Sequence, residues 1–292
     1  MRWLRRVSVV ACGSLLVGCL AQVPALAAPS SAGSKAAPAH SAPAPVPAGA
    51  RRAPGPSRLP DPAKVLPSGW QHSADKAVTV AGDAAGLHVL AASESSGYAW
   101  RTVATLGDPA VQTDLWIGQA CVTASGAFAV VVYAPEQADN MAAQQGVLGR
   151  AAVVNLRTGV VKELGGGFSI AYFDPGCGTG SQAVLTRGGW ANDNSSSDAG
   201  MSTTLVVADA ATGKVSAPVT VAGQVTSAVP YHGQIAAAGG RGVEQVSRSG
   251  RTRLLAATAA VPFELTPAAD GSLGYQVMAG NASAPTAARK VG

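Results

Sequence analysis

The sequence predicts an all-β protein built from repeated antiparallel sheets of about four strands each. The clearest stretch runs from Asp114 to Leu164, where four short apolar or β-branched segments are separated by turn residues. This pattern is typical of strands joined by tight turns, and no long amphipathic helical segment competes with it. The segments that follow look like variants of the same unit. We therefore expect the folded part of the chain to be built by repetition.

Glycines mark the turn before the second strand of each unit. They are Gly86, Gly126, Gly180, Gly233 and Gly271, at steps of 40, 54, 53 and 38 residues. A second turn recurs in register with the first, at Gly159, Gly213 and Gly250. Tight hairpin turns often need a positive φ, which glycine adopts without a steric penalty. Units of this length with four strands predict the blades of a β-propeller, of which about five are visible.

The fifth unit is incomplete in this interpretation. It begins at Val261, and its strand pattern ends near Gly280, so we expect its third and fourth strands to be missing. Unpaired strands at the edge of a sheet recruit other chains. Two alternatives follow: strands from the N-terminal part close the ring, or the chain is a fragment of a longer protein. The sequence favours the fragment, because five blades is an uncommon number.

Residues 1–27 have the layout of a secretory signal peptide. Three arginines precede an apolar run from Val7 to Leu20, and small residues before Ala28 suit cleavage after Ala27. An alternative is a bacterial lipobox ending at Cys19, where the cysteine would be lipidated and become the first residue. Both alternatives predict an exported protein, secreted or attached to the cell surface. The apolar run is too short to remain as a transmembrane helix in the mature chain.

Residues 28–66 are rich in Ala, Pro and Ser and offer little to bury, so we expect a disordered tether before a β-propeller-like domain at 67–292. The net charge of +5 for the whole chain comes from the leader and the tether. From residue 67 onwards, 13 Lys and Arg stand against 15 Asp and Glu. No basic cluster is left in the domain to indicate a nucleic-acid partner.

Cys121 and Cys177 occupy similar places in the second and third units, each shortly before its glycine turn. We predict a disulfide between them, because an exported chain tolerates one and the first strands of neighbouring blades approach each other. His88 is the polar residue of an alternating strand. No other ligand-type residue lies at metal-binding spacing from it, so we expect a packed or solvent-facing side chain.

Two long polar segments, 135–149 and 188–201, follow the second strands of the second and third units. In an antiparallel blade these connections emerge on one face, and long loops on a β scaffold often carry binding sites. The candidate ligand-binding residues are Trp190 as a stacking surface, with Asp193, Asp198, Glu136 and Asp139 as polar groups. The oxygens of the second loop suit a hard cation such as calcium, although the order of an EF-hand is missing. The alternative is that both loops are solvated surface.

The runs GYAWRTVATL, DLWIGQACVTASGAFAVVVYAP, AYFDPGCGTGSQAVL and VADAATGKV extend the pattern over roughly residues 70–280. This arrangement resembles the N-terminal β-propeller, of WD40 or YVTN type, in large secreted multidomain proteins of actinobacteria. The resemblance implies a secreted binding module associated with calcium or a polymer. It supplies no catalytic residue.

Two functions follow from these observations. The first is an exported, non-catalytic module that binds a polymer, a protein partner or another domain of a longer chain. The alternative is a propeller hydrolase or lyase acting on glycans, which would need acidic residues with a His or Arg meeting at the central axis. The few charged residues in the strands favour the module. No nucleophile elbow, phosphate-binding loop or zinc-protease motif is present.

Overall fold

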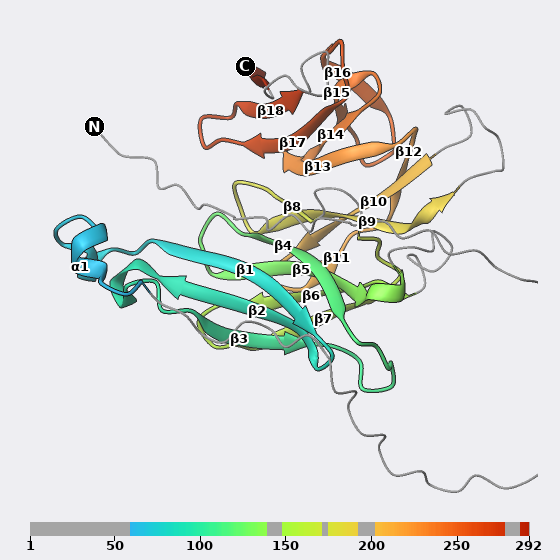
Figure 1. Ribbon diagram of the computed structural model, residues 1–292. Helices are drawn as coiled ribbons and strands as arrows, with labels where there is room; N and C mark the ends of the chain where they lie inside the picture. The colour runs from blue at the N-terminus through green and yellow to red at the C-terminus, as the bar shows by residue number, and fades with distance from the viewer. Residues whose placement is uncertain (1–58, 139–147, 171–174, 192–201, 278–286, 292) are drawn as a thin grey trace, which may run out of the picture.

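The structure is a computed structural model that describes residues 59–138, 148–170, 175–191, 202–277 and 287–291. These residues form five antiparallel sheets in chain order, which Figure 1 shows as successive layers. The predicted all-β architecture of about five sheets is confirmed. The short helical elements described are α1 (Pro62–Val65), η1 (Trp70–His72), η2 (Glu94–Ser96) and η3 (Glu136–Ala138).

The strands of each sheet follow one another in sequence. The first sheet contains β1 (Lys76–Asp83), β2 (Gly86–Ser93) and β3 (Arg101–Leu106). The second contains β4 (Trp116–Val122), β5 (Phe128–Pro135), β6 (Arg150–Asn155) and β7 (Val161–Gly166). The third contains β8 (Gly176–Cys177), β9 (Gln182–Ala191), β10 (Ser202–Asp209), β11 (Lys214–Val215) and β12 (Val219–Ala222). The fourth contains β13 (Val225–Tyr231), β14 (Gln234–Gly239), β15 (Gly242–Val246) and β16 (Thr252–Ala256), and the fifth contains β17 (Pro262–Pro267), β18 (Leu273–Val277) and β19 (Ala287–Val291).

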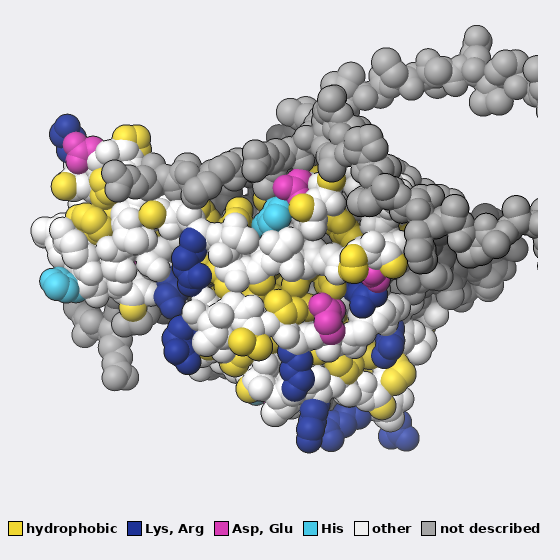
Figure 2. All heavy atoms as spheres, turned by 90° about the horizontal axis from the view of Figure 1, so that it is seen from below, with side chains coloured by type: hydrophobic (Ala, Val, Ile, Leu, Met, Phe, Trp, Pro, Cys, Tyr) yellow, Lys and Arg dark blue, Asp and Glu magenta, His cyan; other side chains and the backbone are white. Residues whose placement is uncertain are grey.

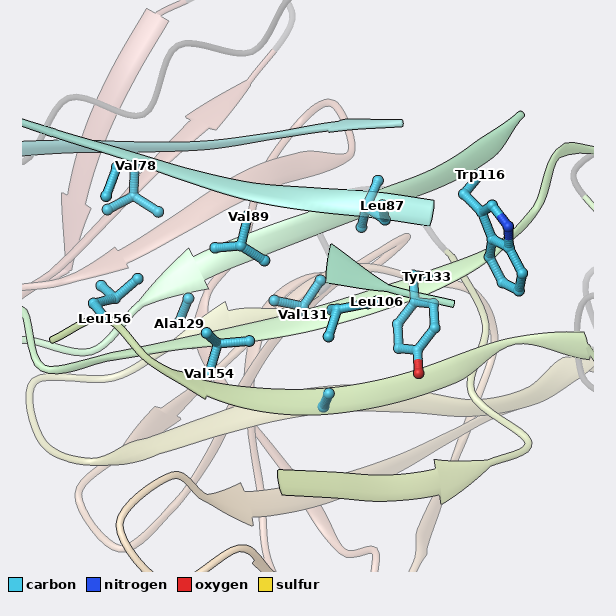
Figure 3. Close-up of a cluster of buried hydrophobic side chains, with 12 residues drawn as sticks. Val78, Leu87, Val89, Leu106, Trp116, Ala129, Val131, Tyr133, Val154 and Leu156 are labelled. Carbon is cyan, nitrogen blue, oxygen red and sulfur yellow. The ribbon is translucent and has the colours of Figure 1, made fainter. Parts of the chain in front are cut away.

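Apolar clusters fill the spaces between successive sheets. Strand β5 shows how one strand serves two of them. Ala129, Val131 and Tyr133 face the first sheet, whereas Val130 and Val132 face the third. Successive side chains of a strand point to opposite faces, so a strand covered on both sides must be apolar at every position. This explains the continuous apolar run at β5. Figure 3 shows the cluster between the first and second sheets.

The first strands of successive sheets contact one another, and glycines permit their close approach. A Cβ atom added at Gly176 in β8 would collide with the carbonyl oxygen of Ala228 in β13. An added Cβ at Gly82 in β1 would likewise collide with the carbonyl oxygen of Trp116 in β4. The small residues of these strands therefore set how closely the sheets pack where they converge.

The first sheet runs in the opposite direction from the others. Gly82, near the end of β1, lies against Trp116 at the start of β4. In contrast, Thr226 near the start of β13 donates a hydrogen bond of 2.6 Å to the carbonyl of Pro262 at the start of β17. After three antiparallel strands, the chain exits the sheet at the opposite end from where it exits after four strands. The turn at Gly86 therefore lies on the other face from the turns of the later sheets.

The structure shows strands and contacts at both ends of the domain that the sequence pattern did not indicate. The expectation that the fifth unit lacks its third strand is wrong, because β19 pairs with β18 from Leu273↔Val291 to Val277↔Ala287. At the other end, the described chain begins inside the segment assigned to the tether. The amide of Leu59 donates to the carbonyl of Gly97, 3.3 Å away, beside the η2 turn of the first sheet. None of the described helices is long and apolar enough to cross a membrane.

Candidate functional site

The predicted ligand-binding residues are described only in part. Glu136 begins η3 directly after β5 and is exposed. Trp190 lies near the end of β9, but its side chain is outside the described part, as are Asp139, Asp193 and Asp198. Strands β5 and β9 end on the same face, because the second and third sheets run in the same direction. Because most of the loop side chains lie outside the described part of the chain, the shared loop site stays a prediction.

A polar network lies beneath that face. The hydroxyl of Tyr133 donates to Glu163 Oε2 at 2.9 Å, and Arg150 Nη1 donates to Asp108 Oδ2 at 3.0 Å. Figure 3 shows the Tyr133 ring below that of Trp116, and the two ring centroids are 5.9 Å apart. Burial, together with the acceptor Glu163, raises the pKa of Tyr133 to about 12. The phenol therefore stays protonated at neutral pH, and its hydrogen bond to Glu163 links β5 to β7.

His88 is held between two side chains on the first sheet. Its Nε2 lies 3.0 Å from Asp83 Oδ1, and its Nδ1 lies 3.0 Å from Thr105 Oγ1. The His88 and Asp83 side chains are 15% and 13% exposed, so His88 is a packed polar residue, one of the two outcomes expected from the sequence. The described residues contain no group of three or more His, Cys, Asp or Glu that could hold a metal ion.

A groove of about 530 Å³ lies between the third and fourth sheets. Its apolar lining residues come from both sheets, and three of them, Val219, Ile235 and Val246, are buried. The aliphatic residues are Val207, Val215, Val219, Ile235 and Val246. Lys214 and Arg248 also line it, and both are exposed. This size and mixture of walls fit the usual range for small-molecule sites in proteins.

The outermost strand of the third sheet is interrupted beside the groove. Strands β11 and β12 both pair with β10, and residues 216–218 separate them. Ser216 continues the pairing at the break, because its Oγ accepts a hydrogen bond of 3.0 Å from the amide of Val207. Pro218 has no amide hydrogen to add to the ladder. The break leaves Ala217 exposed on the groove wall.

Asp209 lines the groove, but its carboxylate oxygens already accept hydrogen bonds from nearby turn residues. Its Oδ1 accepts hydrogen bonds from the amide and hydroxyl of Thr212 at 2.8 and 2.9 Å, and its Oδ2 accepts one from Ser181 at 3.0 Å. The hydrogen bond from the backbone amide of Thr212 makes the largest contribution to lowering the pKa of Asp209. Hydrogen bonds from the hydroxyl groups of Thr212 and Ser181 lower this pKa further. The carboxylate therefore fixes the turn between β10 and β11.

A second hollow of about 340 Å³ adjoins the groove and shares Gln182, Asp209 and Gly233 with it. Tyr231 and His232 form one wall, with ring centroids 4.2 Å apart. His232 has a φ of 47°, a strained backbone conformation for a residue other than glycine. The Tyr231 hydroxyl donates to the carbonyl of Gly271 at 2.9 Å, which ties the wall to the fifth sheet.

The groove lies on the face opposite the predicted insertion loops. It opens beside the turns that join first to second strands and third to fourth strands. The groove leaves no clear pattern in the sequence, because its lining residues alternate within ordinary strands. The one local signal was the sequence Ser216-Ala217-Pro218, which interrupts an otherwise strand-like segment.

A disulfide joins the second and third sheets. Cys121 of β4 is bonded to Cys177 of β8, with Cα atoms 5.7 Å apart, so the structure contains the pairing predicted from the sequence.

In Figure 2, Lys and Arg side chains lie in separate groups with polar and apolar surface between them. That view shows no continuous basic surface of the kind nucleic-acid binding needs.

Neither a protein-family model nor a curated protein matches the chain. Among solved structures, TolB from Acinetobacter baumannii is 14% identical and has a TM-score of 0.47, over 73% of this chain and 50% of TolB. An oligogalacturonate lyase in complex with manganese is 11% identical with a TM-score of 0.41, over 68% of this chain and 54% of the lyase. Sqt1 of Saccharomyces cerevisiae is 12% identical with a TM-score of 0.37, over 68% of this chain and 52% of Sqt1.

These three structures are β-propellers. The chain spans about half the length of each. All three TM-scores are below 0.5, and the identities are 11–14%. The similarity therefore concerns the fold alone.

Proposed function

We propose that the chain is an exported, non-catalytic β-propeller that acts as a binding module, as part of a larger surface or secreted protein. The observation that carries this proposal is the groove between the third and fourth sheets. It combines an apolar lining, exposed cations and a volume of about 530 Å³ on a scaffold of paired strands. The insertion loops carrying Glu136 and Trp190 are a proposed second contact surface on the opposite face.

The composition of the first strands supports binding rather than catalysis. Among the described residues, β1, β4, β8, β13 and β17 carry three charged side chains: Lys76, Asp83 and Glu264. Lys76 and Asp83 are at the two ends of β1, and Glu264 is hydrogen-bonded by Gln276 of its own sheet. A glycan hydrolase or lyase needs paired carboxylates or an acid and a base directed at one substrate. The described first strands bring no such pair together.

The groove can be tested with a neutral apolar fluorophore, N-phenyl-1-naphthylamine. We expect the mature chain to bind it and Ala217→Trp to abolish the binding, because Ala217 is exposed on the groove wall and an indole would fill the space. Ala110→Trp is the matched control, since Ala110 is exposed and does not line the groove. Circular dichroism of both variants checks that the fold is kept. Equal binding by all three proteins would show that the groove does not hold the probe.

A turnover assay separates the module from the enzyme. The mature chain is incubated with pectin, xylan and peptidoglycan, and reducing ends and unsaturated products are measured. The proposal predicts no release above that of a heat-denatured sample. Sustained product release that depends on the concentration of the folded chain would support the glycan hydrolase or lyase instead.

A further inference from the structure

The walls of the groove and the charges at its rim indicate the chemistry of the occupant. The aliphatic side chains offer an apolar body a place away from water, and burying such a body is favourable in proportion to its area. Val246 and Ile235, which are 1% and 4% exposed, are fixed in the core between the sheets. The apolar part of the site is therefore preformed rather than assembled around a ligand.

The rim of the groove carries two cations, Lys214 and Arg248, and one carboxylate, Asp209. The ion pairs of the described residues engage other cations, for example Arg150 with Asp108 and Arg241 with Glu244. Lys214 and Arg248 have no acidic partner among the described residues, and both line the groove. Asp209, the acidic residue of the lining, already accepts two hydrogen bonds from Thr212 in its own turn and one from Ser181 in the turn between β8 and β9. A ligand would therefore meet two available cations beside an apolar wall.

We propose that the groove binds a small amphipathic anion, with an apolar aliphatic or aromatic body and one carboxylate, sulfonate or phosphate group. The proposal rests on the groove being the binding site, as proposed above. The apolar body lies against Val207, Val219 and Ile235, and the acidic group lies between Lys214 and Arg248. A volume of about 530 Å³ is large enough for one such molecule.

The test compares two probes that share the same ring systems. 1-Anilinonaphthalene-8-sulfonate carries a sulfonate, and N-phenyl-1-naphthylamine carries no charge. We expect the mature chain to bind the sulfonate roughly tenfold more tightly, the preference that two partly exposed charge contacts provide. Lys214→Glu with Arg248→Glu should remove this preference and leave binding of the neutral probe unchanged. The preference should also weaken with increasing salt, because exposed charges are screened.

A charge-matched control separates a local contact from the general charge of the protein. Lys76→Glu with Arg157→Glu makes the same change in net charge at two exposed residues outside the groove. We expect this variant to keep the full preference for the sulfonate. An equal loss in this control, or a preference that survives Lys214→Glu with Arg248→Glu, would overturn the proposed anion site.

The failures of the two proposals can be told apart. If the neutral probe binds and is blocked by Ala217→Trp, but the sulfonate has no advantage, the groove is a binding site and the anion proposal is wrong. If neither probe is affected by Ala217→Trp, the groove is not the site and both proposals fail. Near-ultraviolet circular dichroism of each variant shows that probe binding reports the native fold rather than a loosened core.

Discussion

The interface between the second and third sheets differs from the one between the third and fourth. In the first, a disulfide joins β4 to β8 and the apolar cluster includes fully buried Phe168. In the second, β8 and β13 meet at Gly176, but the outer strand is broken between β11 and β12 and a groove opens. The same stacked sheets thus produce a covalently joined interface and an interface with an open groove. Covalent closure and a continuous outer strand suit rigidity, whereas an interrupted strand creates space for a ligand.

The disulfide should give the largest effect on stability. Cys121→Ser with Cys177→Ser removes a bond that spans 56 residues of sequence, and the chain-entropy estimate for such a loop is about 4 kcal/mol. We expect urea denaturation to show a loss of this order relative to the wild type. The wild type treated with dithiothreitol should match the variant. An unchanged midpoint would mean that the bond does not hold the second and third sheets together.

Close packing at the third and fourth sheets should give the next largest effect. Gly176→Ala places a methyl group against the backbone of Ala228, which cannot rotate away. We expect a loss of about 1–3 kcal/mol in unfolding free energy, the usual cost of overpacking. Gly180→Ala is the control, because no heavy atom lies within 4 Å of an added Cβ there. A variant at Gly176 as stable as this control would show that the sheets can separate freely.

The second sheet should also give a pH dependence of stability in the alkaline range. The folded pKa of Tyr133, about 12, lies above its ordinary value of 10.0. Its contribution to stability is therefore fully present below pH 10 and is lost as the pH rises through 12. We expect Tyr133→Phe to flatten the alkaline fall in stability measured by urea denaturation at pH 9 to 12. A fall of unchanged steepness would assign it to another group.

The smallest expected effect concerns the predicted loop on the other face. If residues 192–201 bind calcium weakly, the ion should raise the melting temperature slightly, and Asp193→Ala with Asp198→Ala should abolish the rise. Thermal denaturation with calcium or with a chelator measures it, with magnesium as the ion control. A rise that persists in the variant would place the ion elsewhere, and the absence of any rise would favour a solvated loop.

The sequence predicted what depends on local backbone chemistry and periodicity. Glycine spacing located the hairpin turns, and the matched positions of Cys121 and Cys177 predicted their pairing. It did not predict the reversed first sheet, because a glycine before the second strand marks a turn and does not show how many strands the sheet contains. It also missed β19, whose sequence Ala287–Val291 is short and contains the charged residues Arg289 and Lys290.

The groove could not be predicted because it depends on two sheets at once. Val207 and Ile235 look like ordinary buried strand residues, and only tertiary packing places them on facing walls. Lys214 and Arg248 look like solvated turn residues in the sequence. Their shared position follows from the stacking of the third and fourth sheets, which no local pattern encodes. The predicted loop residues, in contrast, follow from the length and polarity of segments 135–149 and 188–201, which are visible in the sequence.

The most direct test of the groove as a ligand site is a titration of methyl-labelled protein followed by NMR. With decanoate as the ligand, we predict shifts for the methyl groups of Val207, Val219 and Ile235, which line the groove. Val130 and Val132, buried between the second and third sheets, should not move. Shifts confined to residues near Glu136, or spread equally over both interfaces, would contradict a site between the third and fourth sheets.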